Sequence, residues 1–572
     1  MNHELSPIVI PDQMKPMIDG IRTVLHTPVC ELGGMFVERV PMRDGVELVT
    51  QVCVPKGEGP WPCLFTRPSY PTLFKLGAIM NAPWVEQGYA VVIQACRGTA
   101  GSGGEWQPFD NERNDGIDAL KWLAAQPWMD GRIATFGNSY MSYTQWVCAD
   151  EMPKEVKTML IEAYGIDRYA QVYMNGMFRH DIYTSWALTN SGEPEGTDYT
   201  DMYDKALEIR PHKTIDEKLL GRKLAFYQNY ISKIERKEPY WKDSFWETLH
   251  QIPAKINVPV CVIGGWFDHH LDGTLAGYNA LRPEIKAQSR LVVGPWDHLS
   301  SSPGERSYPD ADKFGRGKAL IQQAWLDRII HGKSTDQPLN SEIYIVGEGK
   351  WKTIRQWPVQ SVPCVYYPNA DFTLTEGAGK ADSLRYLYDP ANPVETIGGS
   401  ALLAWTTKLG HTLHGARLQP DYKDRNDVLV FKSQPFEASA TIVGASEVEL
   451  EVSTTAPDTA FMVKLSEELS DGQTFNIVDG TSSILLRNES DEVLSYTPGE
   501  KVKLKVKLWD TAWQIQPSSK LRLDITSSNF PMYHIHPNKA GVWSAFEDWD
   551  TAEQTVYFGD GATSIKIPFA IE

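Results

Sequence analysis

The sequence has little cysteine, no long apolar run and no excess of positive charge. Its seven cysteines are odd in number, scattered, and mostly inside apolar, strand-like stretches, as reduced buried thiols are. No window of eighteen apolar residues occurs, and the first twenty residues lack a basic region followed by an apolar stretch, so we expect no membrane span and a cytoplasmic location. A formal net charge of -18 argues against nucleic acids and anionic membranes as partners.

The alternation of strand and helix patterns in the first part of the chain indicates an α/β domain. Short apolar runs occur at 62–70, 90–98 and 133–137, and residues 111–127 carry an apolar stripe with helical spacing. Residues 35–55 alternate apolar and polar positions on both sides of a turn, as in an antiparallel hairpin at a sheet edge. With 572 residues the chain is long enough for two or three domains, and this part predicts a doubly wound, mostly parallel sheet.

Two changes of pattern divide the rest of the chain. Helical spacing replaces the strand pattern after residue 166, and strand-like runs return at 258–268 and 289–298. Beyond residue 340, period-two runs such as 502–509 and 521–528 indicate antiparallel sheets. We therefore predict an α/β domain at 1–165 and 251–340, a helical cap insertion at 166–250, and a β-sandwich at 341–572.

The stretch "RIATFGNSYMSYTQW" at 132–146 places Ser139 between a buried strand and a helix start. This is the pattern of a nucleophile elbow, although Met141 stands where a small residue is expected, and Gly-Asn-Ser alone is ordinary turn chemistry. An acid and a histidine follow after later strands, Asp268 in "GGWFD" and His298 in "GPWDH", in the order that α/β-hydrolases use. A serine hydroxyl needs a base within reach, and the imidazole needs a carboxylate, so these three residues are candidates for a catalytic triad.

Two other acids compete with Asp268. Asp297 is adjacent to His298 in the sequence and is therefore badly placed to reach its ring nitrogen. Asp272 lies four residues beyond Asp268 in the next expected helix, where a capping or solvent-facing role is typical.

Several histidines and a glycine-rich loop could suggest a metal or a cofactor. The histidines lack a matched acid or thiol cluster and fall in the predicted β-sandwich, which favours structural or exposed roles. The loop "RGTAGSGGEW" lacks the Lys-Ser/Thr of a phosphate loop and the spacing of a dinucleotide site. We therefore predict neither a metal nor a cofactor. The histidines in question are His411, His414, His534 and His536.

Several long blocks are independent of one another, among them "QACRGTAGSGGEW", "GGWFDHHLDGTLAGYNAL" and "LVVGPWDH". Together they resemble the CocE/NonD hydrolases of the X-Pro dipeptidyl-peptidase superfamily, over nearly the whole chain after residue 35. The resemblance implies an α/β-hydrolase domain, a helical cap and a C-terminal jelly roll. It also implies that Ser139 is the nucleophile, Asp268 the orienting acid and His298 the general base. The implied oxyanion hole consists of the Tyr140 backbone N–H and the hydroxyl of Tyr70 in "TRPSY".

The sequence departs from its relatives at two places. Ser142 stands where relatives commonly have a glycine, so the helix is expected to pack slightly less closely against its strand. His269 and His270 follow Asp268, where related α-amino-acid ester hydrolases have two acids that hold a substrate ammonium group. The second departure argues against a substrate with a free amine.

The combined expectation is a cofactor-independent serine hydrolase that cleaves carboxylic esters or activated amides through an acyl-enzyme. Aromatic and Met side chains in the cap, such as Tyr173, Met177, Phe178 and Trp186, are expected in the helix core, with some facing a bulky or apolar substrate. The alternatives are an X-Pro dipeptidyl-peptidase-type aminopeptidase, a β-lactam side-chain acylase and, more distantly, a non-catalytic binding protein. The expected partner is a small ester or amide, and a homo-oligomer is left open.

Overall fold

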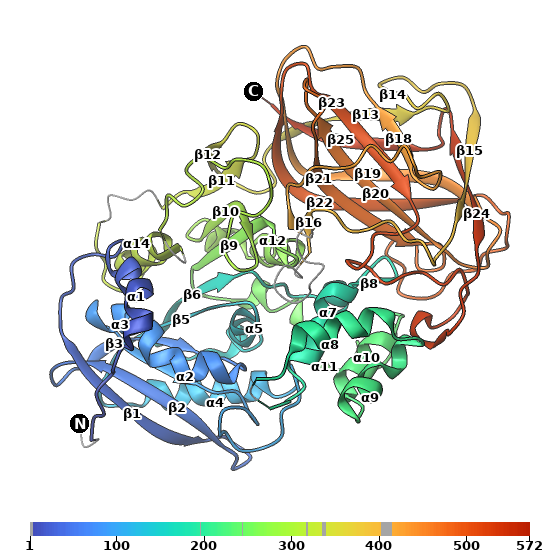
Figure 1. Cartoon of the computed structure of the whole chain (residues 1–572). Helices are drawn as coiled ribbons and strands as arrows, with labels where there is room; N and C mark the ends of the chain where they lie inside the picture. The colour runs from blue at the N-terminus through green and yellow to red at the C-terminus, as the bar shows by residue number, and fades with distance from the viewer. Residues whose placement is uncertain are drawn as a thin grey trace.

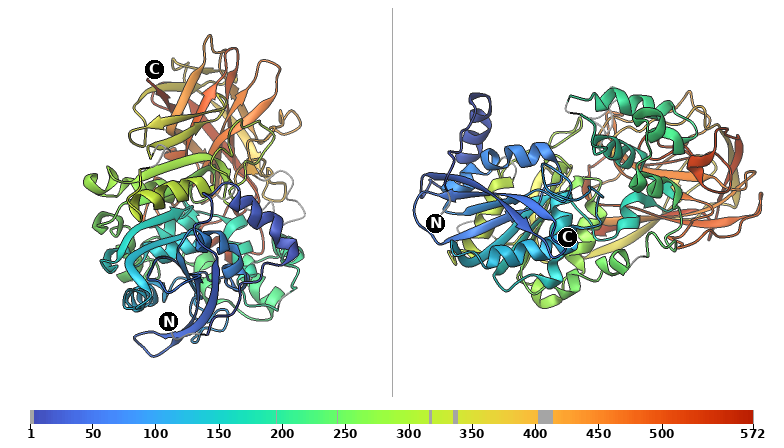
Figure 2. Two further views of the ribbon diagram at one scale, coloured as in Figure 1. Left: turned by 90° about the vertical axis from the view of Figure 1, so that its left-hand side faces the viewer. Right: turned by 90° about the horizontal axis from the view of Figure 1, so that it is seen from below.

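The computed structural model describes residues 4–194, 196–242, 244–315, 318–334, 339–401 and 414–571 (Figure 1). The chain forms an N-terminal α/β part, a helical region and a C-terminal all-β part, drawn in orange and red. The further views agree that the N-terminal hairpin and the C-terminal sheets lie at opposite ends of the molecule (Figure 2). None of the helices in the described ranges is long and apolar enough to cross a membrane. The cytoplasmic location stays a prediction.

The α/β part is built on a ten-stranded mixed sheet with the order β1-β2-β4-β3-β5-β6-β9-β10-β11-β12. From β4 to β11 in that order, each strand is parallel to its neighbours, whereas β1, β2 and β12 pair antiparallel. The predicted edge hairpin and the mostly parallel sheet are therefore confirmed. The strands are β1 (Leu32–Pro41), β2 (Glu47–Pro55), β3 (Trp61–Thr66), β4 (Ala90–Gln94), β5 (Met129–Asn138), β6 (Val156–Glu162), β9 (Val260–Phe267), β10 (Arg290–Asp297), β11 (Ser341–Ile345) and β12 (Lys350–Ile354).

Helices cover both faces of this sheet because successive strand residues point to opposite sides. On one face, Ile93 and Ile263 pack in a cluster with side chains of α2 (Pro71–Met80), α3 (Ala82–Glu86) and α14 (Ala319–Ile329). On the other face, Val92 and Val262 belong to clusters that include side chains of three further helices. These helices are α4 (Glu112–Ala124), α5 (Tyr140–Trp146) and α12 (Leu271–Asn279). The arrangement is the predicted doubly wound layer.

A helical region lies between β6 and β9, as predicted. It begins with a short helix and a two-stranded hairpin and continues with five further helices. Its aromatic side chains pack on the C-terminal part, where the Phe178 ring stacks on Trp543 with centroids 5.2 Å apart. The elements are α6 (Arg168–Val172), β7 (Tyr173–Met174), β8 (Met177–Phe178), α7 (His180–Thr189), α8 (Tyr199–Glu208), α9 (Ile215–Leu220), α10 (Ala225–Ser232) and α11 (Ser244–Leu249).

The C-terminal part contains a seven-stranded and a four-stranded antiparallel sheet. The period-two pattern explains the layering, since Leu504, Val506 and Leu508 are buried while the lysines between them are exposed. The predicted β-sandwich is confirmed, and its jelly-roll connectivity stays a prediction. The strands are β13 (Ser361–Pro368), β14 (Leu374–Thr375), β15 (Asp382–Tyr388), β18 (Leu429–Lys432), β19 (Ala440–Thr454), β20 (Ala460–Glu468), β21 (Thr474–Ser483), β22 (Val502–Ile515), β23 (Lys520–Thr526), β24 (Ala552–Phe558) and β25 (Ser564–Ala570).

The predicted boundary at residue 340 lies directly before strand β11. The strands β11 and β12 follow residue 340, yet they extend the ten-stranded sheet of the α/β part rather than the C-terminal sheets. The polar stretch before them, interpreted as a linker, follows α14 and leads back into the same sheet. Polar composition marks a surface connection, whether or not it joins two domains.

A buried carboxylate joins the α/β part to the sandwich. Glu467 on β20 is 0% exposed, and it accepts hydrogen bonds from Trp513 Nε1 at 2.9 Å and from the Gln516 backbone N–H at 2.7 Å. It also accepts one from Arg306 Nη1 at 3.0 Å, and Arg306 lies in the connection between β10 and α14. Trp513, Gln516 and Arg306 therefore all donate to this one carboxylate.

We expect Glu467→Leu to lower the free energy of unfolding by about 3–5 kcal/mol, because it leaves a largely buried arginine without its partner. The control is Glu449→Leu, which removes the exposed ion pair with Lys503 and should change stability by less than about 1 kcal/mol. Urea unfolding followed by tryptophan fluorescence measures both. Equal effects of the two substitutions would contradict the assignment of Glu467 as a buried link.

Candidate active site

Ser139 occupies a strained turn between β5 and α5. Its backbone has φ 55 and ψ -125, a conformation that non-glycine residues rarely adopt. Gly137 allows the turn to close, since a Cβ at that position would lie 2.4 Å from the Cβ of Met141. The small residue expected at position 141 is therefore not required here, because glycine at 137 provides the space. This geometry is that of a nucleophile elbow.

Ser142, which replaces a glycine of the relatives, bonds the elbow to the neighbouring strand. Its buried hydroxyl donates to the Gly137 carbonyl at 2.6 Å and accepts from the Glu162 backbone N–H on β6 at 2.8 Å. The Ser139 N–H donates to the Glu162 carbonyl at 2.9 Å. The serine thus adds hydrogen bonds that a glycine could not make.

Asp268 and His298 follow the adjacent strands β9 and β10, and their side chains meet. The His298 Nδ1 lies 3.0 Å from Asp268 Oδ2, and the same carboxylate accepts the His270 backbone N–H at 2.7 Å. Because the carboxylate can only accept, the Nδ1 carries the proton and the Nε2 is left to act as a base. Burial by itself lowers the pKa of His298, but the charge of Asp268 and its hydrogen bond outweigh this and raise it above 6.5.

The two competing acids bind other groups. Asp297 accepts the backbone N–H groups of Leu299 and Ser301, both at 2.9 Å, and pairs with His414 Nε2 at 3.1 Å. Asp272 lies 3.4 Å from the Arg179 guanidinium. Of the three acids considered for pairing with His298, the geometry therefore favours Asp268.

Tyr70 and Tyr140 lie beside the elbow, as the resemblance implies. Tyr70 precedes α2, and its phenol oxygen accepts a hydrogen bond from Trp186 Nε1 at 3.2 Å. Burial raises the pKa of Tyr70, while contacts with Trp186 and Ser139 act in the opposite direction without cancelling the rise. The phenol therefore keeps its proton at neutral pH and can donate it. Tyr140 is the first residue of α5, so its backbone N–H is free of an intrahelical partner.

One cavity of about 430 Å³ brings these groups together. Ser139, Tyr70, Tyr140 and His298 all line it. Its remaining walls combine aromatic, aliphatic and polar side chains with the cation Arg168, and none of its lining residues within the described ranges is acidic. Of the cap side chains singled out in the sequence, Trp186 lines the cavity, whereas Tyr173, Met177 and Phe178 are buried in the core. Further aromatic walls are Phe109, Tyr164, Tyr183 and Tyr199.

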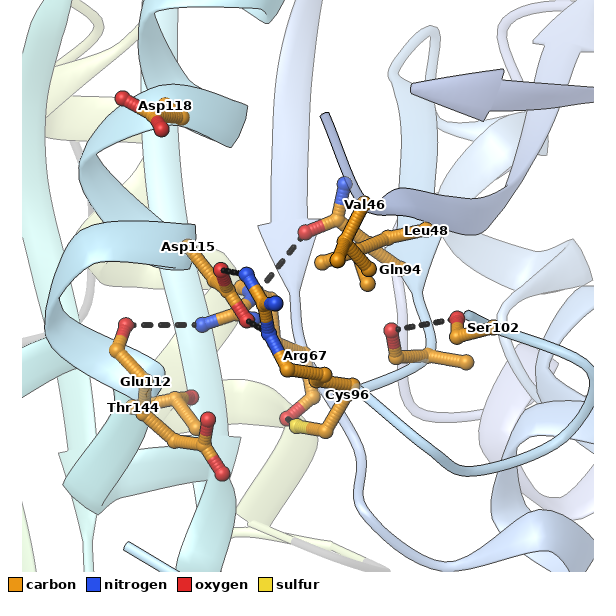
Figure 3. Close-up of polar contacts among 12 residues, drawn as sticks. Val46, Leu48, Arg67, Gln94, Cys96, Ser102, Glu112, Asp115, Asp118 and Thr144 are labelled. Carbon is orange, nitrogen blue, oxygen red and sulfur yellow. Dashed lines mark hydrogen bonds and ion pairs between the residues drawn. The ribbon is translucent and has the colours of Figure 1, made fainter. Parts of the chain in front are cut away.

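A buried polar cluster surrounds Arg67 (Figure 3). Arg67, which is 1% exposed, donates to Gln94 Oε1 at 3.0 Å and to the Glu112 carbonyl at 2.9 Å, and it lies 3.7 Å from Asp115 Oδ2. The Glu112 carboxyl in turn accepts the Tyr140 hydroxyl, and burial raises the pKa of Glu112 to about 7. The cluster fixes the Tyr140 ring. An arginine directly after an apolar strand is the signal in the sequence from which this cluster could be predicted.

A second polar group holds the loop that carries His298. The Glu162 carboxylate, at the end of β6, accepts Ser300 Oγ at 2.9 Å and Lys318 Nζ at 2.5 Å. Lys318 is 4% exposed, so this pair is shielded from water. Neither Glu162 nor Lys318 could be predicted as part of the site, because nothing in the sequence pattern relates positions 162, 300 and 318.

The histidines considered as metal ligands bind protein groups. His534 Nδ1 accepts the Phe178 backbone N–H at 3.0 Å, and His536 Nε2 lies 3.2 Å from Asp458 Oδ2. His411 lies outside the described residues. Within the described ranges, a different group has ligand spacing, namely Asp268, His269 and His298, whose candidate ligand atoms lie within 4.8 Å of one another. Two of its members are already hydrogen-bonded to each other, which is the geometry of an acid and a base rather than of a formed metal site.

Two family models and a curated relative match this chain. Residues 44–300 match the family model of X-Pro dipeptidyl-peptidase (S15 family), and residues 333–564 match the X-Pro dipeptidyl-peptidase C-terminal non-catalytic domain. Cocaine esterase of Rhodococcus sp. (strain MB1 Bresler) is 27% identical over 562 residues, covering 91% of this chain and 95% of the relative.

Two solved structures are similar over nearly their whole length. An aminopeptidase from the marine sediment archaeon Thaumarchaeota archaeon superposes with a TM-score of 0.81 at 22% identity, covering 99% of both chains. An α-amino acid ester hydrolase superposes with a TM-score of 0.78 at 22% identity, covering 94% of this chain and 96% of the other. At 22% identity, the similarity to these two structures shows a shared fold and nothing further.

The fold, the elbow and the matched families define a serine hydrolase of the α/β-hydrolase class. Together the two family models match most of the chain, which belongs to the X-Pro dipeptidyl-peptidase superfamily, as the resemblance to CocE/NonD hydrolases indicates.

We expect activity to rise with pH through a midpoint above 6.5, because the base form of His298 is needed and Asp268 stabilises the protonated form. The pH dependence of kcat/KM with a chromogenic ester measures this midpoint. Asp268→Asn should lower the midpoint and reduce kcat by about 10⁴. The same midpoint in Asp268→Asn as in the wild type would show that Asp268 does not raise the pKa of His298.

Proposed function

We propose that the protein hydrolyses carboxylic esters, and activated amides, through an acyl-enzyme on Ser139. The observation that carries the proposal is the shared cavity, in which a serine on a strained elbow lies with a histidine that is bonded to a buried aspartate. Tyr70 and the Tyr140 N–H are the proposed oxyanion donors.

In the proposed reaction, His298 Nε2 takes the Ser139 proton while Oγ bonds to the acyl carbon. The carbonyl oxygen becomes negative and is bound by the Tyr70 hydroxyl and the Tyr140 N–H. The bond to the leaving oxygen or nitrogen then breaks, and His298 returns its proton to that atom. Water then hydrolyses the acyl-enzyme. His298 takes a proton from water while the water oxygen bonds to the acyl carbon. The bond from that carbon to Ser139 Oγ breaks, and His298 returns the proton to Oγ.

The cavity favours an aromatic or otherwise bulky acyl group over one that carries an ammonium group. Several aromatic rings line it, its lining includes the cation Arg168, and His269 and His270 follow Asp268 where the related amine-binding sites have acids. Burial and nearby positive groups hold the pKa of both histidines well below the usual range, so both are neutral at physiological pH. A substrate ammonium would lose its hydration here without gaining a carboxylate.

A second candidate is the removal of X-Pro dipeptides. The matched family model and the name of the archaeal aminopeptidase favour it. The name of the Rhodococcus relative, and the lack of an acid among the described lining residues, favour ester hydrolysis. We therefore rank the esterase first.

We expect a fluorophosphonate probe to modify Ser139, and Ser139→Ala to lose at least about 10³-fold of p-nitrophenyl butyrate hydrolysis, since the proposed acyl-enzyme forms on the Ser139 hydroxyl. Mass spectrometry of the labelled protein locates the modification. The matched control is Ser142→Ala, which keeps the nucleophile and removes only the hydroxyl bonded to β6. Full activity of Ser139→Ala, or no labelling of the folded protein, would overturn the proposal.

We expect Ala-Pro-p-nitroanilide to be cleaved at least about 100-fold less efficiently than p-nitrophenyl butyrate, because burying an unpaired ammonium costs several kcal/mol. Comparing kcat/KM for the two substrates tests this. An N-acetylated Ala-Pro-p-nitroanilide serves as the control for the charge. Efficient release from the free dipeptide, lost on acetylation, would instead establish the peptidase.

A further inference from the structure

Trp186 on cap helix α7 contacts the side chains of both residues that supply the proposed oxyanion donors. Its Nε1 donates to the Tyr70 phenol oxygen at 3.2 Å, and its ring stacks on that of Tyr140 with centroids 6.3 Å apart and planes inclined by 11°. We propose that Trp186 is a positioning residue that aims the Tyr70 proton at the oxyanion, so that the cap completes the oxyanion hole. The inference rests on the proposed function of Ser139 and Tyr70.

The direction of the Tyr70 proton follows from the chemistry of the two groups. An indole N–H can only donate, so the phenol oxygen must be the acceptor of this hydrogen bond. The single phenol proton therefore cannot point at Trp186 and is left for another acceptor. Ser139 lines the same cavity as Tyr70, and although burial raises the pKa of the Tyr70 phenol, a hydrogen bond with Ser139 acts to lower it. A phenol that accepts one hydrogen bond is also a stronger donor in a second.

The position of Trp186 is fixed from two sides. Its ring packs against Phe109 with centroids 5.5 Å apart and meets Phe226 edge-on at 5.9 Å. Arg179, which precedes α7 and is 1% exposed, donates to the His269 carbonyl at 2.6 Å. Helix α7, which carries Trp186, is thus hydrogen-bonded through Arg179 to the loop directly after the triad acid. This bond fixes the position of the cap relative to the triad.

The test is a double-mutant cycle between Trp186 and Tyr70, measured with p-nitrophenyl butyrate. We expect Trp186→Phe to lower kcat about tenfold, as for the loss of one hydrogen bond, and Tyr70→Phe to lower it by about 10²–10³. In the Tyr70→Phe background, Trp186→Phe should cause little further loss of kcat, because the proton that Trp186 aims is already absent.

A second variant separates the hydrogen bond from the packing. Replacement of Trp186 by its sulfur isostere, 3-benzothienylalanine, keeps the ring and removes only the N–H, so kcat should fall as in Trp186→Phe while KM stays within about threefold. The control is Trp241→Phe, which removes a cap indole that donates to the Lys233 carbonyl at 2.8 Å and does not line the cavity. It should leave kcat unchanged.

The inference is overturned if Trp186→Phe lowers kcat by the same factor with and without Tyr70, or if the isostere has wild-type kcat. Fluorophosphonate labelling of Ser139 in each variant separates this failure from a failure of the proposed function. A labelled and active enzyme with no coupling rejects only the role of Trp186, whereas an unlabelled wild type rejects the triad itself.

Discussion

The backbone conformation of Ser139 is the constraint on which the site depends. A non-glycine residue at φ 55 is strained by about 1–3 kcal/mol, so it persists only where its surroundings allow no other arrangement. Three sets of contacts provide this: the close approach at Gly137, the hydrogen bonds from Ser142 and Ser139 to β6, and the Tyr140 side chain held at Glu112. The buried cluster around Arg67 stabilises the last of these contacts, because Arg67 donates to the Glu112 carbonyl and lies near Asp115.

Each candidate catalytic group comes from the end of a different parallel strand. Tyr70 follows β3, Ser139 follows β5, Asp268 follows β9 and His298 follows β10. Parallel strands bring their carboxyl ends to one edge of the sheet, so four segments far apart in the sequence meet there without any long-range signal in the chain. Cap helix α7 contributes Trp186, which donates to Tyr70 at that edge. The Glu162 carboxylate accepts a hydrogen bond from Ser300 in the loop of the proposed base.

The sequence predicts those parts of the site that follow from chain order. The elbow pattern around Ser139 and the later acid and histidine each follow a recognisable strand, and the resemblance adds Tyr70 and Tyr140. The contacts between segments could not be predicted. Trp186 and Tyr70 are 116 positions apart, and Lys318 and Glu162 are 156 apart, so no periodicity relates them. The pairing of β11 and β12 with the sheet of the α/β part could not be predicted either, because a surface loop within a domain has the same polar composition as a linker.

The pairing of Asp297 with His414 joins the residue next to the proposed base to the C-terminal part, and the Arg306–Glu467 pair adds a second buried link. The α/β part and the sandwich therefore do not form two exchangeable modules. Recombination between relatives that swapped only the C-terminal part would replace the partners of two residues in the α/β part, one of them adjacent to His298. In evolution the two parts are expected to be inherited together, and their contacting residues to change in step.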